Sequence, residues 1–158
     1  RQECWNKIFP EKVATSTSLN WIYSRLRDSN GVVTPRSVID MLTAATEFQK
    51  KNIQINFEDS PDIFPVDALK HGVEIASKNK LENDIYNEFP KDQENIKKLG
   101  KYGKHKLNRH DLESLYGKDW EKTAESLRRI GILRFIRNSN DYMVEFLFRP
   151  ALGITYKY

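Results

Sequence analysis

The sequence predicts a mainly α-helical chain with a small β-hairpin, which is an α+β fold. Three observations lead to this class. Apolar residues recur at helical spacing through most of the 158 residues, and prolines and capping residues separate the periodic stretches. Two short runs rich in aromatic and branched residues stand near the end, separated by Asn and Asp residues that favour a turn. With 39% hydrophobic and 30% charged residues, the composition is that of a folded chain.

The first part of the chain predicts two helices joined by a turn. One covers residues 16–27, with Ser16 or Ser18 as its N-cap. The second covers 35 to about 51 and begins with a proline after Thr34, which is a suitable N-cap. The predicted apolar stripes of the two helices are Leu19, Ile22, Tyr23 and Leu26, and then Val38, Met41, Leu42, Ala45 and Phe48.

Turn and linker residues follow, and we take 53–65 as the boundary between a helical subdomain (1–52) and a second domain (66–158). The second domain opens with a helix over 66–89, which Gly72 and the polar residues after it can bend. A proline ends this helix, and a short helix over 92–99 follows.

The last 55 residues have the clearest pattern. A short strand at 106–107 precedes the cap Asn108 and a helix over 109–116, which Gly117 stops. Asp119 caps a second helix that ends at Gly131. The runs ILRFIR and YMVEFLFR then form a hairpin. Strand, helix, turn, helix and hairpin make a winged helix-turn-helix, and a helix pair followed by an unrelated hairpin is the alternative.

Charge is distributed unevenly along the chain. Residues 1–90 hold 11 Lys/Arg and 13 Asp/Glu, whereas residues 91–158 hold 15 and 9. The basic excess of the C-terminal part indicates a surface that faces nucleic acid. No apolar run is as long as a membrane span and no signal peptide is visible, so we expect a cytoplasmic protein. The single cysteine, Cys4, fits a reducing compartment.

Cations that can bind a phosphate backbone occur in two groups. The first lies in the stretch 97–109, where two glycines suggest a flexible segment, and the second lies in the last helix and the hairpin. The candidates, with one tyrosine that can stack on a base, are Lys97, Lys98, Lys101, Tyr102, Lys104, Lys106, Arg109, Arg128, Arg129, Arg134 and Arg137; Arg149 adds to the hairpin. A solvated, mobile charged loop is the alternative interpretation of the first group.

The helix over 119–130 argues against strong base-specific reading. Major-groove readers usually carry Arg, Asn or Gln near the N-terminal end of the recognition helix, whereas Asp119 and Glu121 stand there. Contact with the DNA backbone therefore fits this pattern better than recognition of bases.

Arg36 is unusual because it places a cation in the first turn of a helix, where the helix dipole favours anions. Its planar guanidinium suits a carboxylate or a phosphate equally well. It therefore either pairs with Asp28, Asp40 or another acid, or it binds a phosphate held by another part of the protein.

Two stretches resemble a known family. W-x-x-x-R-L-x-D-x-x-G-x-x-T-P-R-x-V-I-x-x-L (Trp21 to Leu42), followed by a long helix and a winged-helix pattern ending in F-R-P-A-L-G (Phe148 to Gly153), resembles the C-terminal region of bacterial P-loop ATPases of the signal-transduction (STAND/AAA+-like) type. In those proteins a helical lid follows the nucleotide-binding core, and a winged helix follows the lid. The resemblance implies that Arg36 senses the phosphates of a bound nucleotide.

The chain lacks a G-x-x-x-x-G-K-[ST] phosphate loop, a metal-ligand cluster and a nucleophile with its base, so we expect no catalysis and no cofactor in this chain. It opens on Arg1, and we expect a fragment of a longer protein in which a P-loop core binds ATP and Mg²⁺. The expected partners are that core and double-stranded DNA, with no membrane. A protein-interaction module and a small winged-helix transcriptional regulator are the alternatives, and the sequence does not predict an oligomeric state.

Overall fold

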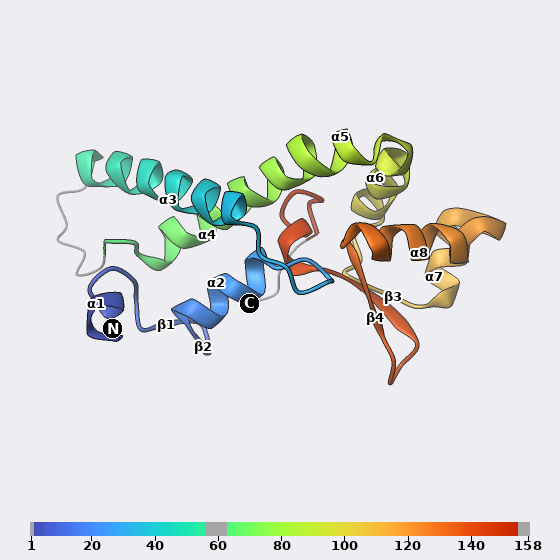
Figure 1. The fold of residues 1–158 in the computed structure, drawn as a ribbon, viewed down its shortest axis with the longest axis horizontal. Helices are drawn as coiled ribbons and strands as arrows, with labels where there is room; N and C mark the ends of the chain where they lie inside the picture. The colour runs from blue at the N-terminus through green and yellow to red at the C-terminus, as the bar shows by residue number, and fades with distance from the viewer. Residues whose placement is uncertain (1, 56–62, 155–158) are drawn as a thin grey trace.

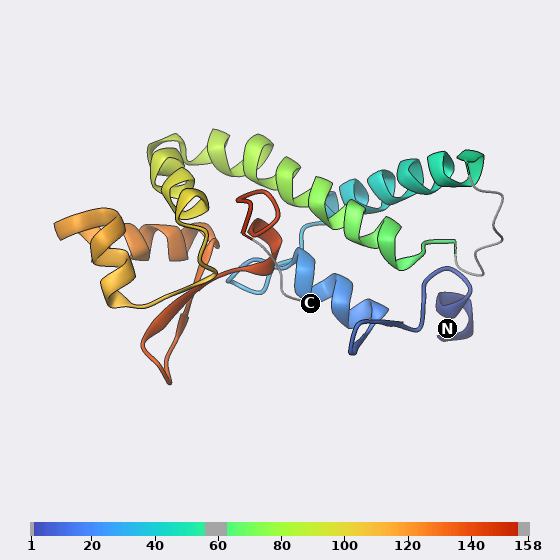
Figure 2. The ribbon, with the colours of Figure 1, turned by 180° about the vertical axis from the view of Figure 1, so that it is seen from behind.

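The computed structural model describes residues 2–55 and 63–154 of the chain. Helices dominate these residues, and the strands form a two-stranded hairpin and a three-stranded antiparallel sheet. The predicted α+β class with mainly helical content is therefore confirmed. Figure 1 shows an elongated molecule whose two ends are joined by one long helical run, and Figure 2 shows the same arrangement from behind.

The N-terminal part contains elements that the sequence pattern did not predict. They are α1 (Gln2–Asn6), β1 (Lys12–Val13) and β2 (Ser16–Thr17), of which the two strands pair with each other. Helix α2 (Ser18–Leu26) then starts later than predicted, and its N-cap is Thr17, whose hydroxyl accepts from the backbone N–H of Asn20 at 3.4 Å. The predicted caps Ser16 and Ser18 are wrong, because Ser16 is in a strand and the Ser18 hydroxyl accepts from the Trp5 indole N–H at 2.7 Å.

The apolar stripe predicted for α2 is only half correct. Ile22 and Leu26 are buried, but Leu19 and Tyr23 are exposed, and Trp21 takes their place in the core. The helix is therefore rotated relative to the prediction, because burying the larger indole removes more apolar surface from water.

Helices α3 (Pro35–Ile55) and α4 (Val66–Asn79) lie side by side and run in opposite directions (Figure 1). Thr34 is the N-cap of α3, as predicted: its hydroxyl accepts from the backbone N–H of Ser37 at 3.3 Å. Gly72 allows the close approach of the two helices, since a Cβ there would stand 2.4 Å from the carbonyl oxygen of Met41. Most of the predicted linker 53–65 lies outside the described residues, and the division into two domains stays a prediction.

The predicted helix over 66–89 is present, but its last part is not a regular α-helix. α4 continues into a π-helical segment, η1 (Lys80–Ile85), and then into a last turn, α5 (Tyr86–Glu88). The change of winding follows directly on the polar stretch expected to loosen the helix, while Gly72 lies within regular helix. A short 3-10 turn, η2 (Pro90–Asp92), leads to α6 (Gln93–Tyr102), which is longer than the predicted 92–99.

The C-terminal part begins with three elements whose bounds match the prediction closely. They are β3 (Lys106–Leu107), α7 (Arg109–Tyr116) and, after the 3-10 turn η3 (Gly117–Asp119), α8 (Trp120–Ile130). Asn108 caps α7 in a reciprocal pair of hydrogen bonds with Asp111. Asp119 occupies the N-cap position of α8, as predicted, but its side chain makes no capping hydrogen bond.

The hairpin is formed by β4 (Leu133–Ile136) and β5 (Asp141–Val144), and β3 joins the other edge of β5, so that the sheet order is β3-β5-β4. The predicted second strand YMVEFLFR is too long. After Val144 the chain turns into a 3-10 helix, η4 (Phe146–Phe148), which packs against α2 and α4. Leu147 and Phe148 thereby join the core that also contains Leu26 and Met41.

Candidate nucleic-acid interface

Arg36 lies in the first turn of α3, and its guanidinium is 3.4 Å from Asp84 in η1. The acids proposed from the sequence have other partners: Asp28 accepts from two backbone N–H groups of its own turn, and Asp40 accepts from the Asn79 amide. The other carboxylate oxygen of Asp84 accepts from Lys80 at 2.8 Å. The Arg36 side chain is 64% exposed, so its 3.4 Å ion pair with Asp84 is open to water.

The basic stretch 97–109 is not the flexible segment predicted from its glycines. Lys97, Lys98 and Lys101 lie on α6, and Gly100 is inside this helix, where a Cβ would stand 3.0 Å from the carbonyl oxygen of Leu152. The second glycine ends the helix and leads into β3. The prediction failed because it took the glycines as sources of backbone flexibility, whereas Gly100 allows α6 to pack closely against the backbone of Leu152.

The carboxylate of Asp111 organises the middle of this stretch. It is only 5% exposed and accepts hydrogen bonds from the hydroxyl of Tyr102 at 2.5 Å, from Lys104 Nζ at 2.8 Å and from the backbone N–H of Asn108 at 3.1 Å. These bonds, first those from Lys104 and Tyr102, lower the pKa of Asp111 to about 2. We call Tyr102, Lys104, Asn108 and Asp111 the Asp111 cluster.

Most other cations of the first group are also engaged by acids. The pairs are Lys97–Glu94 at 2.9 Å, Lys106–Asp141 at 2.9 Å and Arg109–Glu113 at 2.7 Å. Lys98 and Lys101 are exposed on α6 and make no ion pair with another residue that the structure describes. They are therefore the members of this group with charge available to a partner.

The second group of cations surrounds Glu125 on α8. Arg128 donates to both oxygens of this carboxylate at 2.8 Å, and Arg129 donates to one of them at 3.2 Å. The two arginines, Arg128 foremost, lower the pKa of Glu125 to about 2, so that it is charged at neutral pH.

Three predicted cations meet at one hollow of about 380 Å³ between α8, the β4–β5 hairpin and the turn 28–31. We call it the arginine hollow. It is lined by Ser29, Asn30, Glu125, Arg128, Leu133, Arg134, Phe135, Arg137 and Tyr142. Arg134 binds Glu145, which is 2% exposed, at 2.6 Å. Arg137 is exposed at the hairpin turn and has no ion-pair partner within 2–55 or 63–154.

The turn 28–31 reaches this hollow because it is attached to the end of α8. The backbone N–H of Ser29 donates to the carbonyl of Gly131 at 2.9 Å, and the Ser29 hydroxyl donates to the carbonyl of Arg128 at 3.2 Å. Figure 1 shows this turn, between α2 and α3, beside the end of α8 from which the hairpin starts. Nothing in the local sequence indicates that Ser29 and Asn30 contact a segment one hundred residues away.

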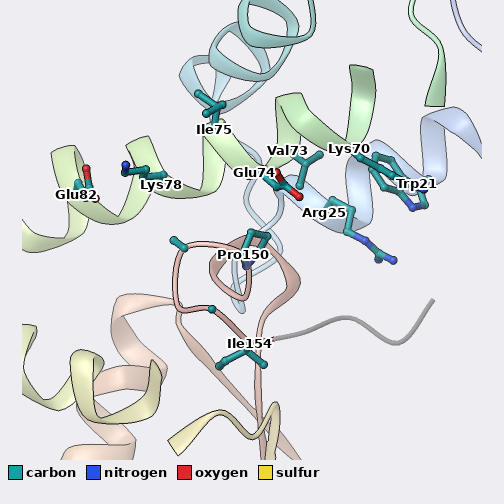
Figure 3. A pocket seen from close by; sticks show the side chains of 12 residues that line it. Trp21, Arg25, Lys70, Val73, Glu74, Ile75, Lys78, Glu82, Pro150 and Ile154 are labelled. Atoms are coloured by element: carbon teal, nitrogen blue, oxygen red, sulfur yellow. The ribbon is translucent and has the colours of Figure 1, made fainter. Parts of the chain in front are cut away.

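A second hollow, of about 590 Å³, contains none of the predicted site residues. It lies between α2, α4 and the turn around Pro150 (Figure 3), and Arg25, Lys70, Lys78, Glu74 and Glu82 give it charges of both signs. Nearby, the guanidinium groups of Arg25 and Arg149 both lie 4.0 Å from the Phe146 ring. Arg149 is 5% exposed and donates to the carbonyl of Val144, so the prediction that it extends the basic surface of the hairpin is wrong.

The described part of the chain contains no group of three or more His, Cys, Asp or Glu side chains that could hold a metal ion. Nor does it contain a helix long and apolar enough to cross a membrane.

No family model matches this sequence, and comparison with curated proteins and with solved structures finds no significant relative.

Proposed function

We propose that this chain is the non-catalytic C-terminal region of a larger bacterial P-loop ATPase, in which α3 belongs to the lid and α6 to β5 form a winged helix that contacts the DNA backbone. The order α6, β3, α7, α8, β4, β5 with the sheet order β3-β5-β4 is the observation that carries the proposal. In a winged helix, α8 is the recognition helix and the β4–β5 hairpin is the wing.

Contact with phosphates is favoured over recognition of bases by the placement of charge. Glu121 is exposed in the first turn of α8, where it would repel DNA, while Arg128 and Arg129 stand at the other end. Lys98, Lys101 and Arg137 are exposed and can each release counterions from a phosphate backbone.

A nucleotide-sensing role for Arg36 is supported by its loose attachment. Because Lys80 also neutralises Asp84, Arg36 can leave this carboxylate without stranding an unpaired charge. A cation held in this way can move to a phosphate at low energetic cost.

Fluorescence anisotropy of a labelled 15-base-pair duplex, measured from low to high salt, tests the DNA contact. We expect the affinity to fall steeply with salt, and the triple variant Lys98→Glu, Lys101→Glu, Arg137→Glu to abolish binding. The control triple variant Lys7→Glu, Lys12→Glu, Lys51→Glu reverses three exposed charges elsewhere and should retain much more of the duplex affinity. Absence of duplex binding by the wild-type chain at low salt, or equal effects of the two triples, would overturn the proposal.

Nucleotide turnover in the longer protein tests the sensor. Arg36→Ala should change turnover, whereas Lys50→Ala, which removes another ion-paired cation of the same helix, should not. Equal turnover in Arg36→Ala and wild type would contradict the role of Arg36.

A protein-interaction module is the second candidate, and one observation favours it. Ile39 is 62% exposed one turn after Arg36, and Val32 just before α3 is 52% exposed. A partner that covers Val32 and Ile39 would remove their apolar surface from water, which favours association. In that case Ile39→Asp would weaken association with the partner domain while duplex binding stayed absent.

A further inference from the structure

We propose that the arginine hollow binds one phosphate group, and that Asn30 and Tyr142 hold it together with Arg128 and Arg137. The inference rests on the proposed DNA contact, because the backbone of a duplex would supply this phosphate. A free phosphate ion has the same chemistry, and the experiments below separate the two sources.

The charge of the hollow favours an anion. Three arginines line it, and two carboxylates, Glu125 in the lining and Glu145 behind Arg134, oppose them, which leaves one positive charge in excess. Glu145 is buried behind Arg134, so it faces this arginine rather than the open side of the hollow. Guanidinium groups in such a cluster are the usual partners of phosphate oxygens.

Donors remain available after the internal hydrogen bonds are made. Arg128 uses Nε and one Nη on Glu125, so its other Nη is not engaged by that carboxylate. The side-chain amide of Asn30 and the hydroxyl of Tyr142 make no hydrogen bond to another residue within the described ranges. Burial raises the pKa of Tyr142, so its hydroxyl keeps the proton that it would donate.

The apolar wall of the hollow strengthens these contacts. Leu133 is fully buried, and the Phe135 and Tyr142 rings pack at 5.1 Å between centroids. A wall of this kind removes water from one side of a bound phosphate, and charge-assisted hydrogen bonds are stronger where water is excluded.

Ser29 is the positioning residue of the site. Its backbone N–H and its hydroxyl both bind carbonyl groups at the end of α8, which fixes the turn against this helix. Asn30 is the next residue, and its place relative to Arg128 is therefore set by two hydrogen bonds. In this way a segment that precedes α3 completes a site on α8 and the hairpin.

Glu125 gives the inference an unusual test, because its charge should oppose the phosphate. Glu125→Gln removes that charge and keeps an acceptor for Arg128. The variant should therefore bind phosphate more tightly than the wild type, a gain that general damage to the fold does not produce.

Two probes are needed, inorganic phosphate followed by NMR titration and the 15-base-pair duplex followed by anisotropy. We expect Arg137→Gln to weaken duplex binding about five- to tenfold and to lower the salt slope by about one. Asn30→Ala should weaken it about threefold, and Glu125→Gln should tighten it about threefold, as expected for one charge interaction near the surface. Lys91→Gln removes an exposed cation outside the hollow and is the charge-matched control.

The outcomes separate this inference from the function on which it rests. If the duplex binds but Arg137→Gln and Glu125→Gln behave like Lys91→Gln, the hollow is not the site, although the DNA contact stands. If phosphate binds and Arg137→Gln weakens it while the duplex does not bind, the hollow is a site for free phosphate and the proposed function fails. If Asn30→Ala alone has no effect, the turn has no part in the site.

Discussion

The Asp111 cluster and the arginine hollow both arise from the basic half of the chain, but they use their cations differently. In the cluster, a buried carboxylate binds Tyr102 and Lys104 and also closes the start of α7. In the hollow, Glu125 is partly exposed and is shared by two arginines, while Arg137 stands apart from it. Whether the carboxylate is buried, like Asp111, or partly exposed, like Glu125, distinguishes cations that stabilise the fold from cations that are available for binding.

The largest effect that tests this comparison is expected from Asp111→Ala. The change removes a buried carboxylate that accepts three hydrogen bonds, including the capping bond at the start of α7, so the free energy of unfolding should fall by about 2–3 kcal/mol. Urea unfolding followed by circular dichroism measures it. Asp119→Ala is the control, because Asp119 is exposed and makes no capping bond, and it should change stability little. A loss in Asp111→Ala no larger than that of the control would break the comparison.

Acid should remove the contribution of Asp111 in the wild type. The pKa of Asp111 is lowered from 3.8 to about 2, first by Lys104 and then by Tyr102. A group with a lowered folded pKa stabilises fully above its unfolded pKa, and this stability is lost as the pH falls through the folded value. We therefore expect the stability difference between wild type and Asp111→Asn to be constant above pH about 4 and to shrink toward pH about 2. A difference that does not change over this window would contradict the assignment.

Gly131→Ala should test how firmly the turn 28–31 is attached to α8. Gly131 has a φ of +98°, and a Cβ there would stand 3.1 Å from the Cβ of Asp28. Left-handed backbone and crowding together should cost about 1–2 kcal/mol. Gly103→Ala separates the two causes, since Gly103 has a φ of +75° but nothing within 4 Å of its would-be Cβ. Equal losses in the two variants would mean that contact with the turn adds nothing.

The smallest effect is expected from Arg36→Ala. This ion pair is 3.4 Å long and its arginine is 64% exposed, so the loss should stay below about 0.5 kcal/mol. Lys80→Ala removes the shorter pair to the same carboxylate, in which both side chains are mostly buried, and should cost more. Chemical denaturation of the two variants decides the order. The opposite order would show that Arg36 is a structural residue, and the case for its mobility would end.

The sequence predicted those parts of the fold in which local chemistry decides the outcome. Asn108 as a cap, Gly117 and Gly131 as stops, and the helices between them follow from side chains a few residues apart. The apolar face of α2 was predicted less well, because whether Leu19 and Tyr23 are buried depends on what the rest of the chain packs against this helix. The early end of β5 also depends on distant contacts, since η4 packs against α2 and α4.

The residues of the candidate site were likewise only partly predictable from the sequence. The cations were identified as residue types, and Arg128, Arg134 and Arg137 are found at one hollow. Their acidic partners were harder to predict, as Asp84 lies 48 positions after Arg36 and no sequence pattern couples the two. Ser29 and Asn30 were missed altogether, because only the folded chain brings their turn to the end of α8.

The π-helical segment at 80–85 gives the long helix two registers. One turn of π-helix holds about one residue more than a turn of α-helix, which rotates everything beyond it by about 100° around the axis. Leu69 and Val73 before this segment and Leu81 and Ile85 within it are nevertheless all buried in the same core. Deleting a single residue there would leave both stretches helical. It would, however, rotate the part of the molecule after this segment relative to the part before it.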